Sequence, residues 1–246
     1  MNPFPPLQNS LGALEADVRR LLSEWDAAGR TAALWNRDAR LWTDRGEADW
    51  LGWLDTVPRQ AATLSTLLSE RDAIYAEGFR QAVVLGMGGS SLAPEVWKRT
   101  FGGTAVQPIE LFVLDSTVPA QIRTLESRLD LAATLFIVAS KSGSTIEPNS
   151  FMAYFYDRVH ALGKGPAGRQ FLAITDPGTK MEQAARDAGF RSLFFGDPSI
   201  GGRFSALSAF GIVPLAILGG PAQELLRRAA EMVRACGPGT PTDRPL

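Results

Sequence analysis

The chain has 246 residues, of which 45% are hydrophobic and 21% charged, values typical of a globular protein with a sizeable core. Its net charge of −1 argues against nucleic acid or an anionic membrane as a partner, so any phosphate must be bound by a local site. Because Cys236 is the one cysteine, an intramolecular disulfide is excluded. With His160 as the one histidine, histidine-based catalysis or a metal site has few residues to use.

Residues 1–78 predict an N-terminal helical segment. Apolar residues recur at three- and four-residue spacing from Leu11 to Trp25, and Gly29 ends the pattern. Further helices are expected at 32–42, 49–56 and 59–77. Five of the six tryptophans lie in this segment: Trp25, Trp35, Trp42, Trp50 and Trp53. We expect them to pack in the core of a helical layer rather than to form a surface that stacks sugars or bases.

Residues 79–236 alternate short apolar runs with amphipathic segments. Strands are expected at 82–85, 109–114, 134–139, 171–175 and 192–195. Helices are expected between them, at 92–101, 119–129, 147–162 and 180–188, and after them at 205–218 and 221–235. This alternation predicts a three-layer α/β/α fold with a five-stranded parallel sheet. The loops that follow the strands then lie along one edge of the sheet, where ligands bind.

Neither a secretory signal at the N-terminus nor a membrane span is expected. The N-terminus lacks a basic region followed by an apolar run, and the longest apolar stretch, 211–218, is too short to cross a bilayer. Residues 237–246, GPGTPTDRPL, predict a linker or tail. A cytoplasmic protein is the simplest expectation.

The first candidate loop, GMGGSS at 86–91, follows a predicted strand and opens a predicted helix. Glycines allow close approach to a ligand, and the N–H groups at a helix start attract anions. The loop is similar to the dinucleotide fingerprint G-x-G-x-x-G, but Ser91 stands at the third glycine position, while Asp115 ends the next strand. Dinucleotide binding, sugar binding and a purely structural turn therefore all remain open.

The second loop, SKSGST at 140–145, offers four hydroxyls and a lysine within six residues at the start of a helix. A phosphate monoester, with several acceptor oxygens and nearly two negative charges, suits such a cluster of donors. The loop lacks the Walker pattern, so nucleotide hydrolysis is not implied. The alternative is a helix N-cap with a serine-rich turn.

The third loop, GGRFS at 201–205, presents Arg203 beside paired glycines at a helix start, where a guanidinium can stabilise negative charge on a substrate. The alternative is an ordinary surface arginine. Lys141 and Arg203 lie on different loops of the same predicted sheet edge, so the two cations could converge.

Together the three loops resemble the signatures of the phosphoglucose isomerase family, which is built from two sugar isomerase (SIS) domains. The strings are GMGGSSLAPEV, SKSGSTIEPN and GGRFSALSAFG, in this order over roughly residues 80–220. The preceding strings LWNRDARLWT and WLGWLDT are similar to the isomerase portion of bacterial bifunctional transaldolase/phosphoglucose isomerases. The resemblance implies interconversion of glucose 6-phosphate and fructose 6-phosphate, without metal or other cofactor.

The resemblance also implies roles for individual residues. The loop that binds the substrate phosphate corresponds to Ser140, Lys141, Ser142 and Thr145, with Ser144 beside it. The loop that contacts the sugar corresponds to Gly88, Gly89 and Ser90. Gly202 and Arg203 correspond to the backbone and guanidinium that stabilise the enediolate-like intermediate, which makes Arg203 the catalytic candidate.

One departure from the family concerns the proton-transfer residues. In the family a glutamate base, a ring-opening histidine and a lysine lie in later segments, and members are roughly twice as long as this chain. His160 and Glu147 match no such motif. We therefore expect a first half that binds sugar phosphate but lacks its base, with apolar surface exposed near the tail and the 205–218 helix. A homo-oligomer or docking with a second SIS domain would cover that surface.

Two other functions are compatible with the residues. The first is a non-catalytic SIS-domain sensor of sugar phosphates, although no basic DNA-recognition helix is evident. The second is a dinucleotide-dependent oxidoreductase that uses the 86–91 loop. The oxidoreductase predicts stabilisation of the fold by a dinucleotide, whereas the isomerase predicts stabilisation by sugar phosphates.

Overall fold

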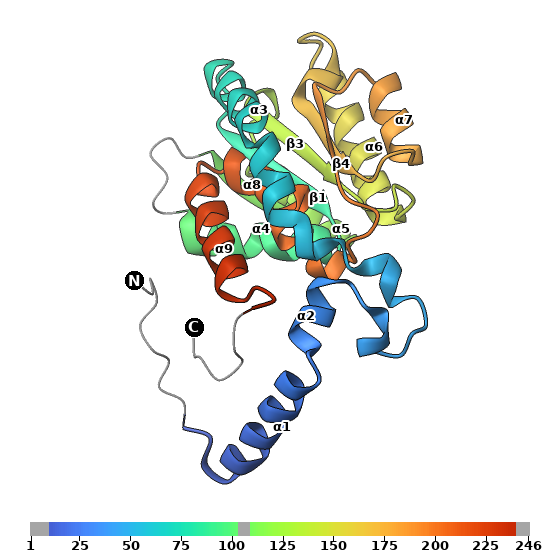
Figure 1. Cartoon of the computed structure of the whole chain (residues 1–246). Helices are drawn as coiled ribbons and strands as arrows, with labels where there is room; N and C mark the ends of the chain where they lie inside the picture. Colours follow the sequence, from blue (N-terminus) through green and yellow to red (C-terminus); the bar gives the residue numbers. More distant parts are fainter. Residues whose placement is uncertain (1–9, 103–108, 240–246) are drawn as a thin grey trace.

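The computed structural model describes residues 10–102 and 109–239, and its centre is a five-stranded parallel sheet (Figure 1). The strands are β1 (Gln81–Gly86), β2 (Glu110–Leu114), β3 (Thr134–Ala139), β4 (Phe171–Thr175) and β5 (Ser192–Phe195), in the order β2-β1-β3-β4-β5. The predicted strands are therefore confirmed to within a residue at either end.

The strand sequences show why the sheet lies at the centre of the molecule. β3 reads TLFIVA and is buried at all six positions, because a parallel strand covered on both faces needs apolar side chains on both. β1 and β3 pair in register from Gln81 opposite Thr134 to Gly86 opposite Ala139. β5, at the edge, is only partly buried.

Helices cover both faces of the sheet, which confirms the predicted three-layer α/β/α fold (Figure 1). One face carries α3 (Thr56–Ala76), α4 (Gly89–Phe101), α8 (Ala209–Ile217) and α9 (Ala222–Ala235). The other carries α5 (Pro119–Glu126), α6 (Ile146–His160) and α7 (Lys180–Asp187). On this second face Phe136 stacks between Phe155 and Phe171, with ring centroids 4.8 Å and 4.9 Å away.

Helix α8 is buried at every one of its nine positions, so the expectation that it exposes apolar surface is wrong. A helix that is apolar all round has no polar face to turn to water and is stable only inside the protein. Exposed large apolar side chains lie elsewhere, on α4 (Leu92, Val96), at the start of α6 (Ile146) and at Phe204. The tail predicted at 237–246 falls outside the described residues from 240 onwards.

The N-terminal segment begins with α1 (Glu15–Ala27) and α2 (Arg30–Trp35), separated by Gly29, whose φ of 61° ends the first helix as expected. None of the residues of α1 or α2 is buried, and α1 extends away from the sheet body (Figure 1). The expectation that the tryptophans form a packed core is wrong, because none of the five is buried. Among the described residues, the apolar stripe of α1 has no helical layer to pack against.

Residues 47–55 return to the body as two 3-10 turns and pack against the loop after β5. Leu51 forms an antiparallel bridge with Ile200, and the Gly52 N–H donates to the Ser199 carbonyl at 3.0 Å. Arg59 on α3 forms an ion pair with Asp197 in the same loop. These contacts place Trp50 beside the carboxyl edge of the sheet.

No helix within residues 10–102 and 109–239 combines the length and apolar character needed to cross a membrane.

Candidate active site

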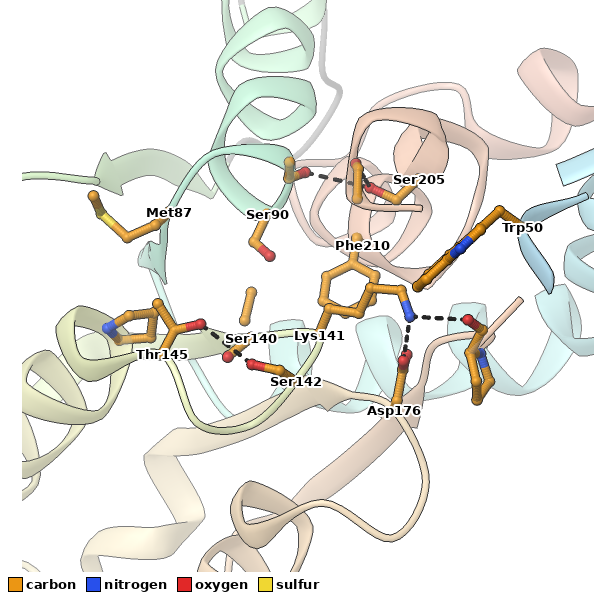
Figure 2. A pocket seen from close by; sticks show the side chains of 15 residues that line it. Trp50, Met87, Ser90, Ser140, Lys141, Ser142, Thr145, Asp176, Ser205 and Phe210 are labelled. Carbon is orange, nitrogen blue, oxygen red and sulfur yellow. Dashed lines mark hydrogen bonds and ion pairs between the residues drawn. The ribbon is translucent and has the colours of Figure 1, made fainter. Parts of the chain in front are cut away.

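The site lies where the chain changes direction across the sheet. β1 and β3 are neighbours, but the loop after β1 leads to α4 on one face and the loop after β3 leads to α6 on the other. Diverging loops of this kind leave a crevice at the carboxyl ends of adjacent parallel strands. A pocket of about 490 Å3 occupies this position (Figure 2).

Residues from separate stretches of the chain line the pocket. They are Trp50, Met87, Gly89, Ser90, Ala139, Ser140, Lys141, Ser142, Thr145, Pro148, Asp176, Pro198, Gly202, Ser205 and Phe210. The three loops singled out in the sequence therefore converge on one cavity.

Ser140, Ser142 and Thr145 form a hydroxyl cluster at the N-terminus of α6. Ser140 is 2% exposed, and its Oγ has no hydrogen-bond partner among the described residues. Ser142 Oγ lies 3.0 Å from Ser144 Oγ and 3.5 Å from Thr145 Oγ1. Thr145 holds the N-cap position of α6, yet its side chain caps no backbone N–H. Side-chain capping therefore does not account for this loop.

Gly143 makes the tight turn of this loop possible. Its φ of 65° suits glycine, and a Cβ there would lie 2.6 Å from Thr179 Cβ. Thr179 in turn caps α7 by accepting from the Glu182 N–H at 3.2 Å. The N-terminus of α7 therefore packs against the turn at Gly143 and fixes the position of the hydroxyl cluster.

Lys141 extends away from the hydroxyl cluster. In Figure 2 its ammonium lies on the opposite side of the pocket from Ser142 and Thr145. It forms an ion pair with Asp176, lies 3.4 Å from the Pro198 carbonyl oxygen and is 5.8 Å from the centre of the Trp50 ring. Burial raises the pKa of Asp176 above its ordinary value, although the neighbouring Lys141 ammonium opposes that rise.

The glycine loop and the arginine loop are in direct contact. A Cβ at Gly89 would lie 2.2 Å from the Gly202 carbonyl oxygen, so only glycine allows this approach. Ser205 Oγ donates to Gly202 O at 2.7 Å within the arginine loop and lies 3.5 Å from Gly89 O across the contact.

The structure separates some of the predicted site residues from the pocket. Gly89, Ser90, Ser140, Lys141, Ser142, Thr145 and Gly202 line it, whereas Gly88, Ser144 and Arg203 do not. Arg203 is exposed, and its guanidinium makes no hydrogen bond or ion pair with the described residues. It is nevertheless adjacent in sequence to Gly202, which places it at the edge of the cavity. The structure thus places Lys141 inside the pocket and Arg203 outside its lining.

Sequence reasoning missed several lining residues, most importantly Trp50 and Asp176. Asp176 immediately follows β4, as Ser140 follows β3, so the rule that ligand-binding residues follow parallel strands could have identified it. Trp50 carried no such signal, because its position depends on the docking of residues 47–55 onto the loop after β5.

The described residues contain no group of three or more His, Cys, Asp and Glu side chains that could hold a metal ion. Asp176 is the one carboxylate among the residues that line the pocket, and it is paired with Lys141. His160 is the exposed last residue of α6.

Comparisons with known proteins identify the same family that the three loops resemble. The family model described as phosphoglucose isomerase matches residues 71–238. The chain is 34% identical over 192 residues to a glucose-6-phosphate isomerase of Thermus thermophilus, covering 77% of this chain and 45% of that protein. It is 35% identical over 153 residues to the corresponding Campylobacter jejuni protein, covering 62% of this chain and 37% of that protein.

Solved structures show the same likeness. The crystal structure of a hypothetical protein from Thermus thermophilus, TT0462, has a TM-score of 0.74 and 29% identity, covering 88% of this chain and 50% of that one. A glucose-6-phosphate isomerase from Chlamydia trachomatis has a TM-score of 0.60 and 27% identity, covering 85% and 39% respectively.

The chain thus spans less than half the length of the two curated relatives. The family match extends over more than half of the chain and includes all three loops that build the pocket. This protein therefore belongs to the phosphoglucose isomerase family.

Proposed function

We propose that this chain binds the phosphate of glucose 6-phosphate and fructose 6-phosphate, and contributes to an aldose–ketose isomerase site. The hydroxyl cluster at the N-terminus of α6 carries the proposal. Ser140 Oγ is buried without a partner among the described residues, and leaving such a group unpaired costs about 1–3 kcal/mol. A bound phosphate oxygen would satisfy it.

The surroundings of the cluster suit an anion. Helix α6 has fifteen residues, and the positive end of its dipole faces the cluster. Asp176, the one carboxylate of the lining, is paired with Lys141 and so does not present an uncompensated charge, and Glu147 in the first turn of α6 lies outside the lining. A dianion can therefore be bound by hydroxyls and backbone N–H groups with little electrostatic penalty.

Catalysis requires a base that removes a proton from the carbon next to the carbonyl group. Asp176 is a poor candidate, because its ion pair with Lys141 occupies one oxygen and its other oxygen is buried. We propose that the base comes from residues other than those that line this pocket. Arg203 would turn toward the pocket and stabilise the negative charge of the intermediate.

Binding can be tested by isothermal titration calorimetry with glucose 6-phosphate and inorganic phosphate, and with a dinucleotide as the negative control. Ser142→Ala should weaken the binding of both phosphates roughly tenfold, as expected for a lost hydrogen bond to a charged group of about 1.5 kcal/mol. Ser150→Ala is the matched control, because its hydroxyl bonds the Ile146 carbonyl on the surface of α6. Equal effects of the two variants, or binding of the dinucleotide alone, would contradict the proposal.

Catalysis can be tested in a coupled assay with fructose 6-phosphate. The 246-residue chain alone should show no turnover above background, and a polypeptide that supplies a second SIS domain should restore activity. Arg203→Ala should abolish most of the restored activity and leave phosphate affinity nearly unchanged. Substantial turnover by the chain alone that survives Arg203→Ala would show that the chemistry is elsewhere.

A further inference from the structure

The pocket has two chemically different ends. The hydroxyl cluster forms one end. At the other end lies an ammonium site, made of Lys141, Asp176 and Trp50 (Figure 2). The three residues come from the loop after β3, the end of β4 and the docked N-terminal segment. The family signature places Lys141 beside the hydroxyls in sequence, but its charge is held on the opposite side of the pocket.

Asp176 is rigidly placed at this end. It is 8% exposed, its backbone N–H donates to the Lys141 carbonyl at 3.1 Å, and its Oδ2 pairs with the Lys141 ammonium. Its Oδ1 has no partner among the described residues and is pressed against Gly196, where a Cβ would lie 2.4 Å away. A buried carboxylate is costly unless it is paired, so its presence here is explained by the cation that it holds.

The ammonium retains one free donor. Of its three N–H groups, one serves Asp176 and one points to the Pro198 carbonyl at the long distance of 3.4 Å. No further partner lies within the described residues. The Trp50 ring covers the same ammonium, and both side chains line the pocket. The third donor is thus available to a ligand oxygen that lies away from the phosphate.

We infer that Asp176 is a positioning residue that directs Lys141 to the hydroxyl or carbonyl oxygen at the sugar end of the ligand. The phosphate is then bound by the hydroxyl cluster without Lys141. The inference rests on the proposed function and adds a specificity device to it. Lys141 would distinguish a phosphorylated sugar from inorganic phosphate, because only the sugar reaches the ammonium site.

The test compares two probes, glucose 6-phosphate and inorganic phosphate, by calorimetry on the full chain. Lys141→Met should weaken glucose 6-phosphate binding about tenfold and leave inorganic phosphate within twofold. Asp176→Asn should also weaken glucose 6-phosphate binding and not inorganic phosphate binding. The effect should be smaller, about fivefold, because the Lys141 ammonium stays charged but is no longer held in place. Ser142→Ala should weaken both probes alike. Lys164→Met, at an exposed lysine distant from the pocket, is the matched control and should change neither.

Every outcome of these measurements either supports the inference or contradicts it. If Lys141→Met weakens inorganic phosphate as much as glucose 6-phosphate, Lys141 is a phosphate ligand and the inference is wrong. It is equally wrong if neither probe is affected. Should Asp176→Asn not fold, as judged by thermal unfolding, Lys141→Met and Lys141→Gln decide alone, since the lysine side chain is 23% exposed. Failure of the unaltered chain to bind either probe would instead overturn the proposed function.

Discussion

The sheet body and residues 10–50 use their apolar side chains in opposite ways. In the body, all six positions of β3 and all nine of α8 are buried. Within residues 10–50 no residue is buried, although α1 carries a clear apolar stripe, and Leu51 is the first buried residue in the part of the chain that the structure describes. An apolar pattern therefore predicts a helix or strand in both regions, but only a partner surface turns that pattern into a core.

The largest effect that tests this contrast is expected in the body. Phe136→Ala removes a ring that is 0% exposed and stacked on both sides, so it should lower the free energy of unfolding by about 3–5 kcal/mol. Phe204→Ala is the control, because Phe204 is 58% exposed and, among the described residues, stacks on one ring, that of Trp53. Urea unfolding should show a loss below about 1 kcal/mol for the control. Similar losses for both would mean that Phe204 is covered in solution.

A second comparison sets a buried leucine of the N-terminal segment against an exposed one. Leu51→Ala should destabilise the protein by about 2 kcal/mol, because Leu51 is 4% exposed and pairs with Ile200. Leu21→Ala, at a 54% exposed position of α1, should change stability by less than about 0.5 kcal/mol. Thermal unfolding measures both variants. A large loss for Leu21→Ala would break the contrast between the two regions, because it would require a partner for α1.

The contact between the first and third loops provides a third test. Gly89→Ala should cost about 1–3 kcal/mol and weaken phosphate binding, since the new methyl group would meet the Gly202 carbonyl oxygen. Gly202→Ala is the matched control on the other side of the contact, where an added Cβ meets nothing within 4 Å. Calorimetric unfolding should separate the two. Equal tolerance would mean that the loops are not in contact.

The smallest effect concerns the attachment of the N-terminal segment at low pH. Burial opposes ionisation of Asp197, but hydrogen bonds from Ser199 and the charges of Arg59 and Lys141 outweigh it and lower the Asp197 pKa. A lowered pKa stabilises the folded state above the ordinary Asp pKa, and this stabilisation is lost as pH falls through the folded value. Asp197→Asn should therefore cost less than about 1 kcal/mol at pH 7. The difference in the free energy of unfolding between Asp197→Asn and the unaltered chain, measured with urea, should shrink below about pH 4. A difference that grows with acid would contradict this sign.

Periodicity and residue type determined most of the body. Runs such as TLFIVA predicted each strand, because a parallel strand buried on both faces must be apolar throughout. The same reasoning placed the loops at 86–91, 140–145 and 201–205 along one edge of the sheet. Once parallel strands alternate with helices, the right-handed crossover leaves little freedom in where those loops emerge.

Tertiary structure alone decided which side chains of those loops act together. Lys141 lies next to the serines in sequence, yet its ammonium pairs with Asp176, thirty-five residues away, because the ends of β3 and β4 are neighbours in the sheet. Trp50 reaches the pocket only because Leu51 and Gly52 dock on the loop after β5. Periodicity reports whether a residue faces a core, whereas ion pairs and docked segments depend on distances across the fold that no local pattern encodes.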